Sequence, residues 1–183
     1  MMAANMTPGQ TAEVAGPKKA FIIQRPEVAS ALIKKAERPL LVVGSEAPNI
    51  ETMDGNLIDS VMRMKKACGL SVAATGHMIG EFNKRGVAGV HSISLMNLGD
   101  RLRDPEWSGL DGEGGYDLVI FTGILYYMEW LVLSGLKNFA TELTTISLDA
   151  NYQPNAGWSL GTMPPKRWRE VLDKLLTVLE GGR

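Results

Sequence analysis

An uninterrupted apolar run that ends in glycine, Leu40-Leu41-Val42-Val43-Gly44, constrains the fold of this chain more than any other feature of its sequence. Such β-branched runs are typical of strands buried on both faces of a parallel sheet, with helices above and below. The same alternation of helix and short strand continues along the chain. We expect strands over residues 39–45, 70–74, 87–93, 117–122 and 143–148, and helices over residues 26–37, 57–68, 77–84, 124–139 and 165–180.

This alternation predicts an α/β fold, in which a three-layer, doubly wound parallel sheet of the Rossmann-like type is joined by right-handed crossovers. If the first strand lies centrally and the chain changes direction after the third, the strand order is 3-2-1-4-5. Residues 18–183 then form a single α/β domain of the nucleotide-binding type. Residues 1–17 mix Ala, Thr, Gly, Gln and Pro without an apolar period, and we expect them to be a flexible N-terminal arm.

In a sheet of this order, ligands bind beyond the carboxyl ends of the strands, where the strand order reverses. Glycine at these ends lets a ligand approach the backbone, and the helix after Gly123 could present its amides to a phosphate. Asp149 has the chemistry to bind a ribose hydroxyl. Tight turns explain the same residues more simply, and His77 fits a turn as well as a site. The candidate cofactor-binding residues are Gly44, Ser45, Gly76, His77, Thr122, Gly123 and Asp149.

Charge and hydropathy exclude several functions. The chain has 19 Lys and Arg against 20 Asp and Glu, a formal net charge of -1, so it lacks the basic excess of nucleic-acid-binding proteins. The apolar stretch 118–128 stops at Glu129, too short to cross a bilayer, and no membrane span is expected. The first residues lack the pattern of a signal peptide, and a single cysteine builds no disulfide framework. We therefore expect a cytoplasmic protein.

The supply of metal ligands is equally small. The chain has one cysteine, Cys68, and two histidines, His77 and His91. An iron-sulfur cluster generally needs about four thiolates and a zinc site about four ligands. We therefore expect no metal site in this chain. Cys68 is interpreted as a small buried hydrophobic residue, and His91 as a structural residue within a strand.

Catalytic motifs are absent or out of context. Neither the dinucleotide fingerprint G-x-G-x-x-G nor the P-loop pattern G-x-x-x-x-G-K-[ST] follows any predicted strand. The segment Gly157-Trp158-Ser159-Leu160-Gly161 fits the G-x-S-x-G pattern of a nucleophile elbow. Prolines flank it on both sides, however, and no histidine lies beyond His91, so serine hydrolysis is disfavoured. We assign no catalytic residue.

The predicted helix over residues 124–139 is apolar on nearly all of its faces. A helix of this kind is buried by more than its own sheet. It therefore predicts a contact surface for another subunit or for a second copy of the chain. The alternative is a helix enclosed within the monomer.

Several segments resemble known families. Glu37-Arg38-Pro39-Leu40-Leu41-Val42-Val43-Gly44 resembles the start of the central domain of thiamine-diphosphate enzymes, which keeps a nucleotide-binding fold and often carries no catalysis. From about Lys18 to Glu180 the chain is more similar to the epsilon subunits of the archaeal carbon monoxide dehydrogenase and acetyl-CoA decarbonylase/synthase complex. The segments that carry this second resemblance are Arg25-Pro26-Glu27-Val28-Ala29, Arg38-Pro39-Leu40-Leu41-Val42-Val43-Gly44, Asp117-Leu118-Val119-Ile120-Phe121-Thr122-Gly123, Leu148-Asp149 and Tyr152-Gln153-Pro154-Asn155-Ala156.

The second resemblance implies a fold like that of NAD- and FAD-binding domains, and a place in archaeal one-carbon metabolism and methanogenesis. It implies a non-catalytic accessory subunit that stabilises a large alpha subunit in a two-alpha two-epsilon assembly. The alpha subunit would carry the nickel-iron-sulfur clusters that oxidise CO or reduce CO2 during reversible acetyl-CoA cleavage. The accessory subunit would also aid electron transfer if it bound FAD.

Two alternatives stay open from the residues. The first is a free-standing flavin- or nucleotide-binding oxidoreductase that uses the crevice at the strand ends. The second is a relative of the thiamine-enzyme central domain that serves a different partner. The sequence alone leaves open whether any cofactor binds, whether the chain associates with itself, and whether it is an enzyme.

Overall fold

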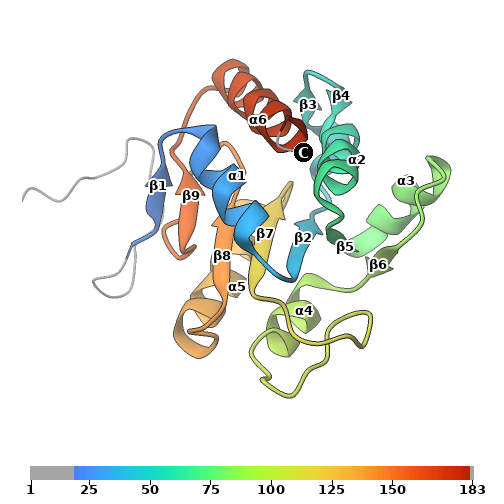
Figure 1. The fold of residues 1–183 in the computed structure, drawn as a ribbon, viewed down its shortest axis with the longest axis vertical. Helices are drawn as coiled ribbons and strands as arrows, with labels where there is room; N and C mark the ends of the chain where they lie inside the picture. Colours follow the sequence, from blue (N-terminus) through green and yellow to red (C-terminus); the bar gives the residue numbers. More distant parts are fainter. Residues whose placement is uncertain (1–18, 182–183) are drawn as a thin grey trace, which may run out of the picture.

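The computed structural model describes residues 19–181, so the arm predicted over residues 1–17 lies outside the described part of the chain. A seven-stranded parallel sheet forms the centre of the fold (Figure 1). Its strands are β1 (Phe21–Ile23), β2 (Pro39–Val43), β5 (Ser71–Ala74), β6 (Val90–Ser92), β7 (Leu118–Thr122), β8 (Thr144–Ser147) and β9 (Trp158–Leu160).

The helices are α1 (Pro26–Lys35), α2 (Leu57–Cys68), α3 (Ile79–Lys84), α4 (Leu95–Arg101), α5 (Tyr126–Phe139) and α6 (Pro165–Glu180). Two short 3-10 turns, η1 (Ala47–Asn49) and η2 (Gly76–Met78), follow β2 and β5. A small antiparallel hairpin, β3 (Glu51–Thr52) with β4 (Gly55–Asn56), leads into α2. None of the helices in residues 19–181 has the length and apolar character needed to span a bilayer.

The strand order is β1-β9-β8-β7-β2-β5-β6. Read from β6 to β8, five of these strands follow the predicted order 3-2-1-4-5, and the α/β class is confirmed. The sheet differs from the prediction at its other edge, where β9 and β1 add two short strands. Both pair in parallel, with Phe21 opposite Trp158 and Ile146 opposite Trp158 on the other side.

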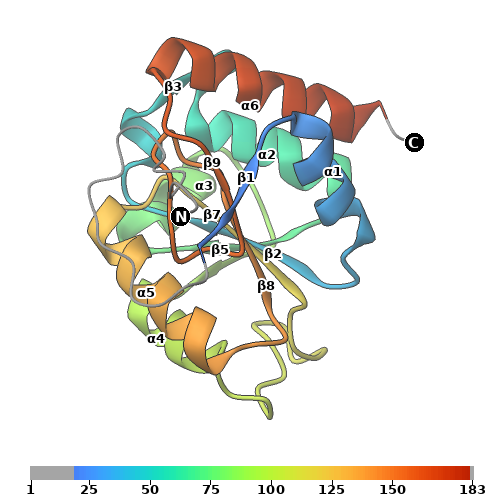
Figure 2. The ribbon, with the colours of Figure 1, turned by 90° about the vertical axis from the view of Figure 1, so that its left-hand side faces the viewer.

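Helices cover both faces of the sheet (Figure 2). Helices α1, α2 and α6 pack together on one face, and α4 and α5 pack on the other. The strands feed both cores because successive side chains point to opposite faces. In β2, Leu41 and Val43 join the core beneath α1, α2 and α6, whereas Leu40 and Val42 join the core beneath α4 and α5.

Local chemistry sets the helix ends. Asn56 caps α2 by accepting from the amides of Ile58 and Asp59, and the Asp59 carboxylate accepts from the amide of Asn56 in return. Gly69 ends α2 in the left-handed conformation, with φ 67°. Pro165 begins α6, where its missing N–H is not needed.

The two central strands are aligned at their starts by Asp117. Its carboxylate oxygens accept from the backbone amides of Glu37, at 2.7 Å, and Arg38, at 2.8 Å. This contact fixes where β2 and β7 begin, and they then pair in register from Pro39 opposite Leu118 to Val43 opposite Thr122. The carboxyl ends of these two central strands therefore lie side by side, at the end of the sheet where its strands finish.

Candidate functional site

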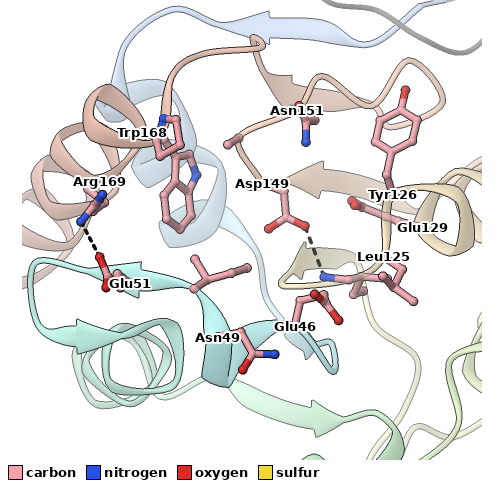
Figure 3. A pocket seen from close by; sticks show the side chains of 14 residues that line it. Glu46, Asn49, Glu51, Leu125, Tyr126, Glu129, Asp149, Asn151, Trp168 and Arg169 are labelled. Atoms are coloured by element: carbon pink, nitrogen blue, oxygen red, sulfur yellow. Dashed lines mark hydrogen bonds and ion pairs between the residues drawn. The ribbon is translucent and has the colours of Figure 1, made fainter.

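A cavity of about 480 Å³ lies beyond the carboxyl ends of β2 and β7, where the strand order reverses. Its walls come from η1, the start of α5, the residues after β8 and the first turn of α6 (Figure 3). Ile50, Ile124, Leu125 and Trp168 give it an apolar lining. Its carboxylates are Glu46, Glu51, Glu129 and Asp149.

Asp149 is tied to the turn that follows β7. Its Oδ1 accepts from the Thr122 hydroxyl at 3.1 Å and from the Gly123 amide at 2.7 Å, and its Oδ2 accepts from the Ile124 amide at 3.3 Å. Burial raises the pKa of Asp149 to about 6, although these three hydrogen bonds act in the opposite direction. The group therefore changes charge close to neutral pH.

Glu129 lies beside it on α5, with its carboxyl group directed toward Asp149 (Figure 3). It is fully buried, and its Oε2 accepts from the side-chain Nε2 of Gln153 at 3.1 Å. Its Oε1 has no hydrogen-bond partner among the described residues. Burial raises the pKa of Glu129 well above its ordinary value, and the charge of Asp149 raises it further. The protonated form of Glu129 is thus favoured.

Trp168 forms the wall contributed by α6. Its indole N–H donates to the Leu148 carbonyl at 2.7 Å, which fixes the ring against the end of β8. At the rim, Arg169 forms an ion pair with Glu51 at 3.1 Å (Figure 3). The pocket therefore has an acidic floor and apolar walls, and an Arg169–Glu51 ion pair lies at its rim.

The seven predicted cofactor-binding residues occupy different places in the structure. Asp149 lines the pocket, and Thr122 and Gly123 lie directly beneath it as hydrogen-bond donors to Asp149. Ser45, Gly76 and His77 are exposed and do not line this pocket, and neither does Gly44.

Gly44 is required by close packing of the protein itself. A side chain there would place its Cβ 2.2 Å from the Gly123 carbonyl oxygen. Its amide donates to the Thr122 carbonyl at 2.9 Å, and the Glu46 amide donates to the Gly123 carbonyl at 3.0 Å. The two turns at the strand ends thus bind each other.

These contacts also occupy backbone amides that could otherwise bind the pyrophosphate of FAD or NAD. Phosphate sites in such folds use free backbone amides at the strand-to-helix turn. Here the Asp149 carboxylate accepts hydrogen bonds from the amides of Gly123 and Ile124, and backbone carbonyls accept from the amides of Gly44 and Glu46. The carboxylate of Asp149 already lies where an anion would accept from the Gly123 and Ile124 amides.

Sequence reasoning missed several lining residues, above all Glu129. The signal was present, because Glu129 shares helical spacing with Val132, Leu133 and Leu136, all of which are buried. A carboxylate on the buried side of an apolar helix is unusual and marks a special environment. Trp168 and Arg169 lie in the helix predicted over residues 165–180, but the sequence did not mark either of them as a site residue.

The G-x-S-x-G segment forms β9 and holds no nucleophile. Ser159 is fully buried, accepts from the Gln153 amide at 3.0 Å and donates to the Leu160 carbonyl at 2.8 Å. No group of three or more His, Cys, Asp or Glu side chains within residues 19–181 is arranged to hold a metal ion. Burial raises the pKa of the half-buried Cys68 thiol, which disfavours a reactive thiolate.

Comparison with known proteins decides the family. Residues 3–176 match the family described as CO dehydrogenase beta subunit/acetyl-CoA synthase epsilon subunit. The chain belongs to this family. The match covers nearly all of the α/β domain, including every strand and helix that forms the pocket.

Relatives in the CO dehydrogenase beta/acetyl-CoA synthase epsilon family are similar over most of their length. The acetyl-CoA decarbonylase/synthase complex subunit epsilon of Methanothrix soehngenii is 37% identical, over 96% of this chain and 92% of the relative. The corresponding subunit of Methanothermobacter thermautotrophicus is 34% identical, over 92% and 93%. Subunit epsilon 1 of Methanosarcina barkeri is 38% identical, over 84% and 86%. The family resemblance expected from the sequence is confirmed.

Proposed function

We propose that this chain is the epsilon subunit of an acetyl-CoA decarbonylase/synthase complex and that it acts by docking rather than by catalysis. Its partner is the large alpha subunit that carries the nickel-iron-sulfur clusters of the CO dehydrogenase component. The observation that carries this proposal is the similarity, over 84% to 96% of this chain, to subunits of that name in three archaea. The chain's own donor set supports it, because one cysteine and two histidines cannot supply a cluster.

A surface of α5 is the candidate docking face. Tyr127 and Leu131 are 60% and 50% exposed and lie one helical turn apart on the same side of α5. The opposite side of α5, with Val132, Leu133 and Leu136, is buried in the core. Exposed aromatic and aliphatic side chains of this size are typical of subunit contacts. We refer to Tyr127 and Leu131 as the α5 face.

Docking would stabilise the alpha subunit by mass action, since a partner that binds only the folded state lowers the population of unfolded protein. A two-alpha two-epsilon assembly is the arrangement we propose. In such an assembly each α5 face covers apolar surface of one alpha subunit.

The role in electron transfer to FAD has less support from the residues. FAD, if bound, would let the subunit exchange both single electrons and electron pairs. However, the amides of Gly44, Glu46, Gly123 and Ile124 already donate to acceptors within the protein, so they are not available to its pyrophosphate. We therefore propose a stabilising role without a flavin held in this crevice. The same observation weighs against a free-standing flavin- or nucleotide-binding oxidoreductase.

Anaerobic affinity purification of the tagged chain from its native host tests the proposal. We expect a large partner with nickel and iron, at a mass by native mass spectrometry that fits two copies of each subunit. A homo-oligomer without metal would contradict the docking role. A yellow preparation that releases flavin on denaturation would instead support the oxidoreductase.

A further inference from the structure

The pocket at the end of β2 and β7 carries an excess of negative charge. Its lining includes four carboxylates and a single guanidinium, that of Arg169. Arg169 already pairs with Glu51 at the rim. Glu46 and Asp149 face the cavity without a basic side chain in its lining to balance them. Glu129 is protonated when no cation is bound, and a bound cation would favour the loss of that proton. An anionic ligand would be repelled by this arrangement, and a cation attracted.

Two oxygen atoms on the pocket floor have hydrogen-bonding capacity that the protein leaves unused. Oε1 of Glu129 is buried and has no partner among the described residues. Oδ2 of Asp149 accepts one bond, at 3.3 Å, and has room for another. A buried polar atom without a partner is unfavourable, so native proteins rarely leave one unpaired. Once Glu129 has lost its proton to solvent, both oxygens can accept hydrogen bonds from a cationic ligand.

The remaining walls are apolar. Ile50, Ile124 and Leu125 line the pocket together with Trp168, whose indole is fixed by its hydrogen bond to the Leu148 carbonyl. These side chains offer no donors or acceptors to a polar ligand body. They fit an aliphatic stem that leads from the mouth of the pocket to its floor.

We propose that this pocket binds an ammonium or guanidinium group carried on an aliphatic stem. The cationic group donates hydrogen bonds to Oε1 of Glu129 and Oδ2 of Asp149, and the stem packs against Trp168 and Ile124. A guanidinium has several donors in a planar fork and suits two carboxyl groups that lie side by side. Such a group occurs on free amines and on the arginine and lysine side chains of a partner. The pocket lies within one chain, so binding does not require the assembly proposed above.

Titration of the full chain with butylguanidinium, followed by calorimetry or NMR, tests this directly. The neutral analogue butylurea has nearly the same shape, and inorganic pyrophosphate is the anionic probe. We expect butylguanidinium to bind at least tenfold more tightly than butylurea, and pyrophosphate to leave the pocket resonances unchanged. Equal affinities for the two butyl compounds, or preferential binding of pyrophosphate, would overturn the proposal.

Glu129→Gln is the decisive variant. The side-chain Nε2 of Gln153 donates to Oε2 of Glu129 in the wild type. In the variant, the side-chain oxygen of the new glutamine must accept this bond, so its NH2 group faces the ligand. Donors then face the cation, and affinity should fall at least tenfold while the fold is retained. Glu106→Gln makes the same change on the exposed surface, away from the pocket, and should bind as the wild type does.

Asp149→Asn provides a second variant, with circular dichroism as the check on folding, and should weaken binding by a similar factor. Unchanged affinity for butylguanidinium in both folded variants would contradict the proposal. The source of the cation is then read from the purified complex. A partner side chain in the pocket would block butylguanidinium, whereas a site for a free amine would still bind it.

Discussion

The Oδ1 atom of Asp149 accepts a 2.7 Å hydrogen bond from the backbone amide of Gly123. Asp149 follows β8 and Gly123 follows β7, so this contact joins the ends of two neighbouring strands. In many folds of this class the amides of such a turn face a bound phosphate. Here an internal carboxylate takes that role, which leaves the pocket above it acidic.

Removal of this carboxylate should uncover an anion site. Asp149→Ala leaves the donors of Thr122, Gly123 and Ile124 without their acceptor, and we expect the free energy of unfolding to fall by about 2 kcal/mol. Millimolar pyrophosphate should restore part of this loss in the variant and have no such effect on the wild type. Urea denaturation with and without pyrophosphate measures both. Equal stabilisation of the two proteins would contradict the account.

Glu129 should make stability depend on pH. Its pKa is raised in the folded state, so the folded protein binds this proton more tightly than the unfolded chain does. The contribution of Glu129 to the free energy of unfolding is therefore complete below its unfolded pKa of about 4.5, and it is lost as the pH rises through its folded pKa. Glu129→Gln removes this loss. At about pH 8 we expect the variant to exceed the wild type in free energy of unfolding, and below about pH 4 we expect this advantage to disappear.

The matching measurement is a series of urea denaturation curves between about pH 4 and pH 8. Because Asp149 and Glu129 influence each other's titration, the difference between the curves reports Glu129 together with its effect on Asp149. Parallel curves across this range would show that Glu129 titrates normally.

A pair of glycine substitutions separates close packing from ligand access at the strand ends. Gly44→Ala forces a Cβ to 2.2 Å from the Gly123 carbonyl oxygen and 2.5 Å from the Ile124 Cα, both of them backbone atoms. We expect a loss of at least about 3 kcal/mol. Gly135→Ala, in α5 with open space around its Cβ, should instead stabilise the protein by about 0.5–1 kcal/mol. Thermal unfolding of the two variants tests this, and a tolerated alanine at Gly44 would contradict the packing.

The central strands and their order were predictable because their signals are strong and local. Leu40 to Val43 and Leu118 to Phe121 are fully or almost fully buried, and each shows the continuous apolar run of a two-faced strand. The outer strands carry no such signal. Strand β1 has three residues, of which Phe21 and Ile22 are exposed, and β9 is equally short. Helix α4 has seven residues and contains Gly99, which weakens its propensity.

The site was predicted less completely than the fold. Strand ends locate Asp149, because topology alone places the end of a parallel strand near a ligand. Topology does not show what such a residue binds. Asp149 turns back on the protein's own amides, and its neighbour Glu129 comes from a helix that sequence reasoning treated only as apolar surface. Their pairing depends on side-chain direction across two elements, which no local pattern records.

The most direct test of the docking role is the nickel content of the chain after anaerobic affinity purification from its host. The wild type should bring nickel down in stoichiometric amounts. Leu131→Asp, on the α5 face, should lower nickel per mole of tagged chain at least tenfold, because it places a charge in the proposed contact. Met53→Asp, an equally exposed change in the β3–β4 hairpin, should behave as the wild type does. Wild-type chain without nickel, or full nickel with Leu131→Asp, would contradict docking through α5.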